Sequence, residues 1–396
     1  MRRWLVAAAL VTTACRGNHH DHDVRPAPAP APKAAPAPIV PKLSLSPDGM
    51  EELRGLDQRI AIHKDKPGAE LQYLSERATA FGRLEDYQAM VAISADWVAK
   101  EPANTDAWLG REKALSTVHD FAGARAALAH VPPDKAAEDT IALDEATGHR
   151  DRSLAAREKV AREQPNPITL TMYLAGLALA GRFDEARALI PKAAALVRDN
   201  PPTLFAWFYF QWGRVYEQMG DTATARAFYE ESHRRMPMIE ATAHLAQALI
   251  AMHETDAAKR LVTETLAIDP HPSILELGVP LGVTKVDDAK AAWDRYVTAL
   301  PLAFADHAAR FYLTVDPKRA LELARENLAN RDVPEARSLV VLAALAANDS
   351  AAACSVVDPL LDAPQRADRF AAWRALSKCG RGSDAARLAK NLGIGP

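Results

Sequence analysis

Residues 206–237 have the sequence AWFYFQWGRVYEQMGDTATARAFYEESHRRMP. In the first half, large aromatic residues recur at steps of three and four, which is the spacing of one helix face: Tyr209, Trp212 and Tyr216. Gly220 then supplies a residue suited to the end of a helix, and Pro237 closes the second half. The stretch therefore predicts two antiparallel helices joined by a tight turn.

Related units recur along the chain. Three of them end at Pro201, Pro237 and Pro270, so that successive ends lie 36 and 33 residues apart. An aromatic residue, a large residue followed by Gly, further aromatics around an Ala, and a terminal Pro at a spacing of about 34 residues resemble the tetratricopeptide repeat. The resemblance covers about residues 45–396 and is most specific in these three units. It implies an all-α fold, an α-α superhelix of about ten helix pairs.

Composition leads to the same fold class. The chain has 396 residues, and the alternation of apolar and polar residues that is typical of strands is scarce. The formal net charge is −3, with both signs mixed throughout the sequence. This balance disfavours a large basic face, so we expect no nucleic-acid partner.

The repeat pattern weakens at residues 273–301. Residues that disfavour a helix interrupt the first half of this unit: Gly278, Pro280 and Gly282. We interpret the unit as a bend in the solenoid. It would divide an N-terminal lobe, residues 45–270, from a more degenerate C-terminal lobe, residues 271–396.

The N-terminus carries a targeting segment. Two arginines precede the apolar run WLVAAALV and the small residues before Cys15, as in an export signal. The end of the segment resembles a bacterial lipoprotein signal, in which the Cys is acylated, although Thr12 departs from the preferred Leu. The resemblance implies a signal peptide at residues 1–15, a lipid on Cys15 and, because Arg16 follows instead of Asp, an outer-membrane lipoprotein facing the periplasm. The alternative is an ordinary cleaved signal in which Cys15 is incidental.

Residues 16–44 predict an extended tether between this anchor and the repeats. Residues 24–42 are dominated by Pro and Ala, which prevent helix and sheet and favour the polyproline conformation. Three His and two Asp precede them within residues 19–23. Such groups can bind Zn²⁺ or Cu²⁺ weakly, but nothing nearby would preorganise a site. We therefore interpret them as a polar spacer and expect no metal site.

Two cysteines lie in the last predicted repeats. Cys354 begins the second helix of one pair, and Cys379 ends the first helix of the next. Neighbouring helices in such a solenoid are antiparallel, so these two ends meet. The geometry and an exported location both allow a disulfide. The alternative is two small buried residues that take the place of Ala.

Motifs that carry catalysis are absent from the sequence. It contains no phosphate-binding loop of the G-x-x-x-x-G-K-[ST] type, no H-E-x-x-H and no G-x-S-x-G. We therefore expect a protein that is not an enzyme and uses no cofactor.

A binding face is the better candidate site. In tetratricopeptide proteins the first helices of the pairs line a concave groove. On the first predicted helix of the opening stretch, one face opposite the aromatic seam carries Trp207, Phe210, Arg214, Glu217 and Gln218, and Thr171 and Gln247 hold matching positions in adjacent units. The resemblance implies that these seven residues contact a partner. The alternative is that Trp207 and Phe210 pack against neighbouring helices as additional core.

These features predict a non-catalytic scaffold or adaptor, anchored in the bacterial cell envelope by a lipid. It would bind a protein or peptide partner and support assembly of an envelope machine such as a secretin, pilus or outer-membrane complex. The alternative is an accessory subunit that binds peptide or glycan for a separate envelope enzyme. Aromatic residues around a closed pocket, rather than along an open groove, would favour that alternative.

Overall fold

A computed structural model describes Val40 and residues 49–198 and 201–394. Cys15 and the His- and Asp-rich stretch at 19–23 lie outside the described residues. Within them, every regular element is a helix, which confirms the predicted all-α class. No helix in this part of the chain combines the length and the apolar composition that a membrane span needs.

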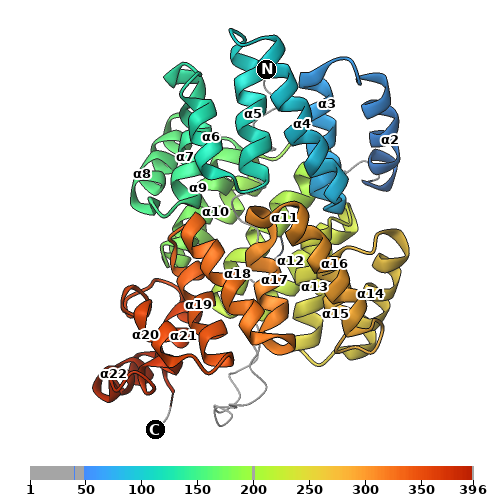
Figure 1. The fold of residues 1–396 in the computed structure, drawn as a ribbon. Helices are drawn as coiled ribbons and strands as arrows, with labels where there is room; N and C mark the ends of the chain where they lie inside the picture. Colours follow the sequence, from blue (N-terminus) through green and yellow to red (C-terminus); the bar gives the residue numbers. More distant parts are fainter. Residues whose placement is uncertain (1–39, 41–48, 199–200, 395–396) are drawn as a thin grey trace. The chain divides into compact units, whose positions relative to one another are not determined.

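The helices follow one another in pairs (Figure 1). A single helix comes first, α2 (Gly49–Ile62). Seven pairs follow: α3 (Pro67–Phe81) and α4 (Leu84–Lys100), α5 (Thr105–Thr117) and α6 (Phe121–Leu128), α7 (Pro133–Ala146) and α8 (Arg150–Glu163), α9 (Pro167–Leu179) and α10 (Phe183–Leu196), α11 (Pro202–Met219) and α12 (Thr222–Arg235), α13 (Ile239–Ala251) and α14 (Thr255–Ile268), α15 (Pro272–Gly278) and α16 (Val286–Ala299). Three more pairs complete the described chain: α17 (Pro301–Val315) and α18 (Pro317–Asn330), α19 (Pro334–Ala346) and α20 (Ser350–Ser355), then, after the 3₁₀ helix η1 (Asp358–Leu360), α21 (Arg366–Leu376) and α22 (Gly382–Leu392). These ten pairs confirm the predicted number.

The stretch quoted at the outset forms α11 and α12, as its spacing predicts. Gly220 ends α11 with φ of 84°, a left-handed conformation that glycine adopts without strain. The Asp221 side chain then caps α12 by accepting a hydrogen bond from the backbone N–H of Thr224. Gly213 lets the two helices approach, because a Cβ at this position would lie 2.7 Å from the Tyr229 ring.

The described chain divides into two compact units. Unit 1 contains residues 40–178 and 182–304, and unit 2 contains residues 305–394 with Leu179–Gly181. The unit that departs from the repeat pattern, α15 and α16, belongs to unit 1, where α15 packs against α13 and α14. The division between the two units falls after Phe304, and the predicted boundary between two lobes at residue 271 stays a prediction.

Helix α11 is the centre of the core of unit 1. All its residues from Pro202 to Val215 are buried, including the rings of Trp207, Phe208 and Trp212. Residues 204–210 are seven consecutive aliphatic or aromatic residues, which cover the whole circumference of the helix and therefore need neighbours on every side. Helices α9, α10 and α12 supply part of this cover, and one apolar cluster runs through these four helices.

The two ends of unit 1 meet. The turn between α3 and α4 reaches the segment around α15 and α16, where Tyr296 Oη donates a hydrogen bond of 3.2 Å to the Gly82 carbonyl oxygen. Arg83 Nε lies 2.9 Å from Asp269 Oδ2, although the two residues are 186 positions apart in the sequence. A second apolar cluster joins Leu53 and Ala80 at one end to Ile274 at the other. Unit 1 is thus closed on itself rather than open at both ends.

A buried group of charges lies where α5 and α7 face each other. Lys113 Nζ contacts Asp139 Oδ1 at 3.0 Å, and the two side chains are almost completely buried. Glu112 accepts a hydrogen bond of 2.6 Å from Ser116 Oγ, and its other carboxylate oxygen has no hydrogen-bond partner. Burial, together with the negative charge of Asp139, raises the pKa of Glu112 to about 7, against the opposing effects of Lys113 and Ser116.

In unit 2, a disulfide joins Cys354 of α20 to Cys379, which follows α21. Their Cα atoms are 5.6 Å apart, within the usual range for a disulfide. Both residues are half-buried. Of the two alternatives that the sequence left open, the structure contains the disulfide.

Candidate functional site

The residues predicted to line a groove are mostly inside the molecule. Thr171 of α9 is fully buried and its hydroxyl accepts a hydrogen bond of 3.1 Å from the indole Nε1 of Trp212. Trp207 and Phe210 are 0% and 2% exposed. Neither of these two rings presents a surface to a partner, and both have the core position that the sequence left as the alternative. The apolar circumference of α11 is the sequence signal that indicates this outcome.

Phe210 packs among rings from the next two helices. Its centroid lies 5.9 Å from that of Tyr229 in α12 and 5.3 Å from that of His244 in α13, the latter edge to face. Such ring pairs contribute more stabilising free energy than the burial of their surface area alone would supply. Phe210 therefore ties α11 to α12 and α13.

The charged residues of this face form a buried cluster of their own. Glu217 contacts Arg214 Nε at 3.1 Å and His244 Nδ1 at 2.8 Å. Burial alone would raise the pKa of Glu217, but His244 and Arg214 outweigh it and hold the pKa below its usual value. Burial and the charge of Glu217 raise the pKa of Tyr229 well above its ordinary value. The cluster is an internal ion pair, with Glu217 charged and Tyr229 neutral.

Gln218 and Gln247 are half-buried, as is Glu217. The structure thus brings Arg214 and Glu217 of α11 together and links them to α13 through His244, but these residues are parts of a packed interior. The seven residues do not form a continuous exposed strip.

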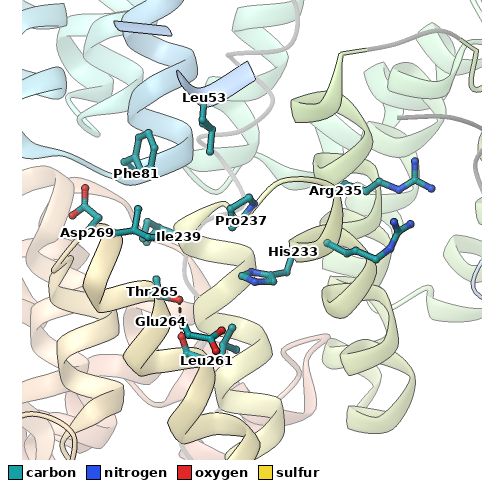
Figure 2. A pocket seen from close by; sticks show the side chains of 12 residues that line it. Leu53, Phe81, His233, Arg235, Pro237, Ile239, Leu261, Glu264, Thr265 and Asp269 are labelled. Carbon is teal, nitrogen blue, oxygen red and sulfur yellow. Dashed lines mark hydrogen bonds between the residues drawn. The ribbon is translucent and has the colours of Figure 1, made fainter. Parts of the chain in front are cut away.

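A pocket of about 320 Å³ opens elsewhere in unit 1, where its two ends meet (Figure 2). Its lining comes from α2, α3 and the segment from α12 to the end of α14: Leu53, Phe81, His233, Arg234, Arg235, Pro237, Ile239, Leu261, Glu264, Thr265, Ile268 and Asp269. Half of these residues are apolar. No sequence motif predicts the pocket, because it forms only where helices far apart in the chain come into contact.

The walls of the pocket are apolar. Leu53 and Ile239 are buried, and Phe81 is half-buried. Ile268 stands at the edge with 53% of its surface exposed, which makes it one of the most exposed large apolar side chains among the described residues. Such a side chain beside an apolar cavity is typical of a surface that receives a ligand or a partner.

His233 places a polar ring inside this apolar setting. Figure 2 shows the ring between Pro237 and Glu264. Its Nδ1 lies 2.8 Å from the hydroxyl of Thr242. Burial lowers the pKa of His233, with Glu264 opposing the shift, so the imidazole is neutral at pH 7. A neutral ring can exchange hydrogen bonds with a bound polar group without the cost of a buried charge.

Opposite charges mark the two edges of the pocket. At the end of α12, Glu231 accepts hydrogen bonds from Arg234 (2.6 and 2.8 Å) and Arg235 (2.9 Å), which leaves a net positive edge. The Arg234 side chain is 64% exposed. Across the pocket, Glu264 is exposed and acts electrostatically on His233, whereas Asp269 is paired with Arg83. Burial raises the pKa of Asp269, and Arg83 limits the shift.

The polar groups of the pocket are partly engaged already. The Thr265 hydroxyl donates to the Leu261 carbonyl oxygen at 2.8 Å and is therefore already engaged. Among the described residues, no group of three or more His, Cys, Asp or Glu side chains is arranged to hold a metal ion. An apolar side chain, flanked by charges that match Arg234 and Glu264, is the ligand that this arrangement fits.

No known family model matches the sequence, and no curated protein matches it either. Solved structures with a related arrangement of helices include three that illustrate the range. The Cut9–Hcn1 hetero-tetramer of the APC/C has 15% identity and a TM-score of 0.46, covering 90% of this chain and 76% of that one. The human IFIT1 dimer with PPP-AAAA has 13% identity and a TM-score of 0.39, covering 87% and 95%. A tetratricopeptide repeat protein from Parabacteroides merdae ATCC 43184 has 14% identity and a TM-score of 0.35, covering 77% and 98%.

Proposed function

We propose that the protein is a non-catalytic scaffold that binds a segment of another protein in the pocket formed by α2, α3 and α12–α14. The observation that carries this proposal is the pocket itself. It combines apolar walls, an exposed Ile268 and charged edges of opposite sign. Covering the exposed half of Ile268 would contribute about 1 kcal/mol to binding.

The composition of the walls favours a peptide over a glycan. Four of the twelve lining residues are Leu or Ile, and Phe81 is the one residue of the Phe, Tyr or Trp type in the lining. Sugars bind best against several flat aromatic faces, whereas an aliphatic wall suits a Leu, Ile or Met side chain of a partner.

We place this scaffold in the bacterial cell envelope, held to the outer membrane by a lipid on Cys15 and facing the periplasm. The support for this part is the N-terminal sequence described above. Membrane fractionation of the native protein and a Cys15→Ser variant tests it. The native protein should sediment with outer membranes, and the variant should be released. Equal sedimentation of both proteins would contradict lipid anchoring through Cys15.

The binding test uses crosslinking and pull-down from envelope fractions with an Ile268→Glu variant. A carboxylate at the edge of the apolar wall should reduce recovery of the partner at least ten-fold. The matched control is Ile62→Glu on α2, since Ile62 is 64% exposed and does not line the pocket. Both variants alter exposed side chains and should keep native helicity and melting.

A partner that the Ile268→Glu variant loses and the Ile62→Glu variant keeps would support the pocket. Retention of every partner by both variants would refute the assignment of the binding site. Loss in both variants would point to a general effect of added negative charge instead of the pocket.

A further inference from the structure

Three of the described helices end at the pocket with their carboxyl termini. Phe81 is the last residue of α3, Arg235 the last of α12 and Ile268 the last of α14, and all three line the cavity. The final carbonyl groups of a helix have no partner within the helix, and this end carries a partial negative charge. The backbone around the pocket therefore favours a cation.

Basic residues compensate one of these helix ends more than the other two. The last turn of α12 contains His233, Arg234 and Arg235, whereas the last turns of α3 and α14 contain no basic residue. Arg83, just after α3, is paired with Asp269, just after α14, so this ion pair adds no net charge. The ends of α3 and α14 thus keep their negative character on the side of the pocket away from α12 (Figure 2).

Glu264 adds a full negative charge on the same side. It lies one turn before Ile268 on α14, and its side chain is exposed. The ring of His233 lies beside it in the pocket and is neutral at pH 7, because burial lowers the pKa of this histidine. Since the ring carries no charge to neutralise the carboxylate, the negative charge of Glu264 is left for a ligand.

The arginines across the pocket already have partners. Glu231 accepts hydrogen bonds from both Arg234 and Arg235. Figure 2 shows the Arg235 side chain directed away from α14, and its guanidinium carbon lies 5.5 Å from the centre of the Phe205 ring. An acidic group of a partner would compete with Glu231 for these arginines, whereas a basic group would meet an exposed carboxylate on α14.

We propose that the partner segment carries Lys or Arg next to its aliphatic side chain, and that Glu264 determines this preference. The aliphatic side chain enters the pocket beside Ile268, and the cation lies near Glu264 and the carboxyl end of α14. Lys and Arg suit this position because their apolar stems cover Ile268 while the charged group reaches the carboxylate. This inference rests on the proposed function, since it names the class of segment that the same pocket selects.

A phage-displayed peptide library tests the preference. Each peptide has a central Leu, Ile or Met with random residues on both sides, and it is selected in parallel against the full chain and against Ile268→Ser, which adds no charge. Among peptides that need Ile268, Lys and Arg next to the central residue should exceed Asp and Glu about five-fold. If no peptide needed Ile268, the proposed function and this inference would both fall. If such peptides lacked the excess of Lys and Arg, this inference alone would fall.

Charge reversal tests the role of Glu264. The probes are the most enriched library peptide and the same peptide with Glu in place of each Lys or Arg, both followed by fluorescence anisotropy. Glu264→Lys should weaken binding of the basic peptide about ten-fold and strengthen binding of the acidic one, because repulsion replaces attraction. The matched control is Glu163→Lys, since Glu163 is exposed, ends α8 and does not line the pocket. Unchanged binding with Glu264→Lys, or an equal loss with both variants, would overturn the proposal.

Discussion

Glu112 provides a direct test of how burial controls charge in this fold. We expect a Glu112→Gln variant to be more stable than the native protein above neutral pH and equally stable in mild acid. The reason is that the carboxyl, 2% exposed beside Lys113 and Asp139, has its pKa raised from 4.5 to about 7. The amide is neutral at every pH and can still accept the hydrogen bond from Ser116.

The sign and size follow from linkage between proton binding and folding. Because the folded state holds the Glu112 proton to higher pH than the unfolded chain does, stability falls as pH rises from about 4.5 to about 7. A shift between these two pKa values corresponds to roughly 3 kcal/mol, which is fully lost only above the folded pKa. The Glu112→Gln variant does not lose this stability as the pH rises, because its amide does not titrate.

The assay is chemical unfolding followed by circular dichroism at pH 5 and pH 8. The free energy of unfolding of Glu112→Gln should exceed that of the native protein by up to about 3 kcal/mol at pH 8 and by less than about 1 kcal/mol at pH 5. Glu163→Gln is the control, because Glu163 is exposed and belongs to none of the charge clusters described above. A constant difference between Glu112→Gln and native protein at both pH values would refute the reasoning.

Three further predictions concern the packing. Cys354→Ser should lower the stability of unit 2 by roughly 3 kcal/mol, since the bond to Cys379 spans 25 residues; a reducing agent should lower the unfolding midpoint of the native protein and leave that of the variant unchanged. Gly82→Ala should lower the free energy of unfolding by about 2 kcal/mol or more, because φ is 65° and a Cβ would lie 2.6 Å from a His271 ring nitrogen. Gly220→Ala should lower it by only about 1 kcal/mol, because φ is 84° but the space around a Cβ is open. Phe210→Ala should lower the free energy of unfolding by about 3–5 kcal/mol; a well-folded variant with native stability would show that the ring is not part of the core.

Local spacing was sufficient to predict the helix pairs. The three- and four-residue steps in residues 206–237, and the turn at Gly220, depend only on nearby positions, and α11 and α12 have the predicted form. The disulfide is a similar case, because neighbouring helices in a repeat array place the ends with Cys354 and Cys379 together.

The closure of unit 1 could not be predicted in this way. Repeat periodicity describes how each pair packs on the next, but it carries no information on whether the seventh pair returns to the first. The contacts of Arg83 with Asp269 and of Tyr296 with Gly82 depend on the accumulated rotation of all the pairs between them. The pocket is lined by residues from both ends of unit 1, and it could therefore not be predicted from the sequence.

The face assigned to a groove shows a second limit. Helical spacing correctly separates the side of α11 that carries Tyr209 and Trp212 from the side that carries Trp207 and Phe210. It does not say whether another helix covers the second side. In the structure Phe210 lies against Tyr229 and His244, so both sides of α11 are interior.

The contact between the ends of unit 1 has a consequence for how the protein unfolds. In an open array of repeats, a terminal pair can fray while its neighbours stay folded, because it contacts one neighbour only. Here α3 cannot leave without exposing the groups around Asp269 and Tyr296. Local unfolding at one end therefore breaks contacts at the other end as well. A substitution that changes the amide exchange rate in α3 should change the rate in α15 in the same direction. Gly82 and Arg83 thus join the first helix pair of unit 1 to the last, and a substitution at either residue should loosen both ends.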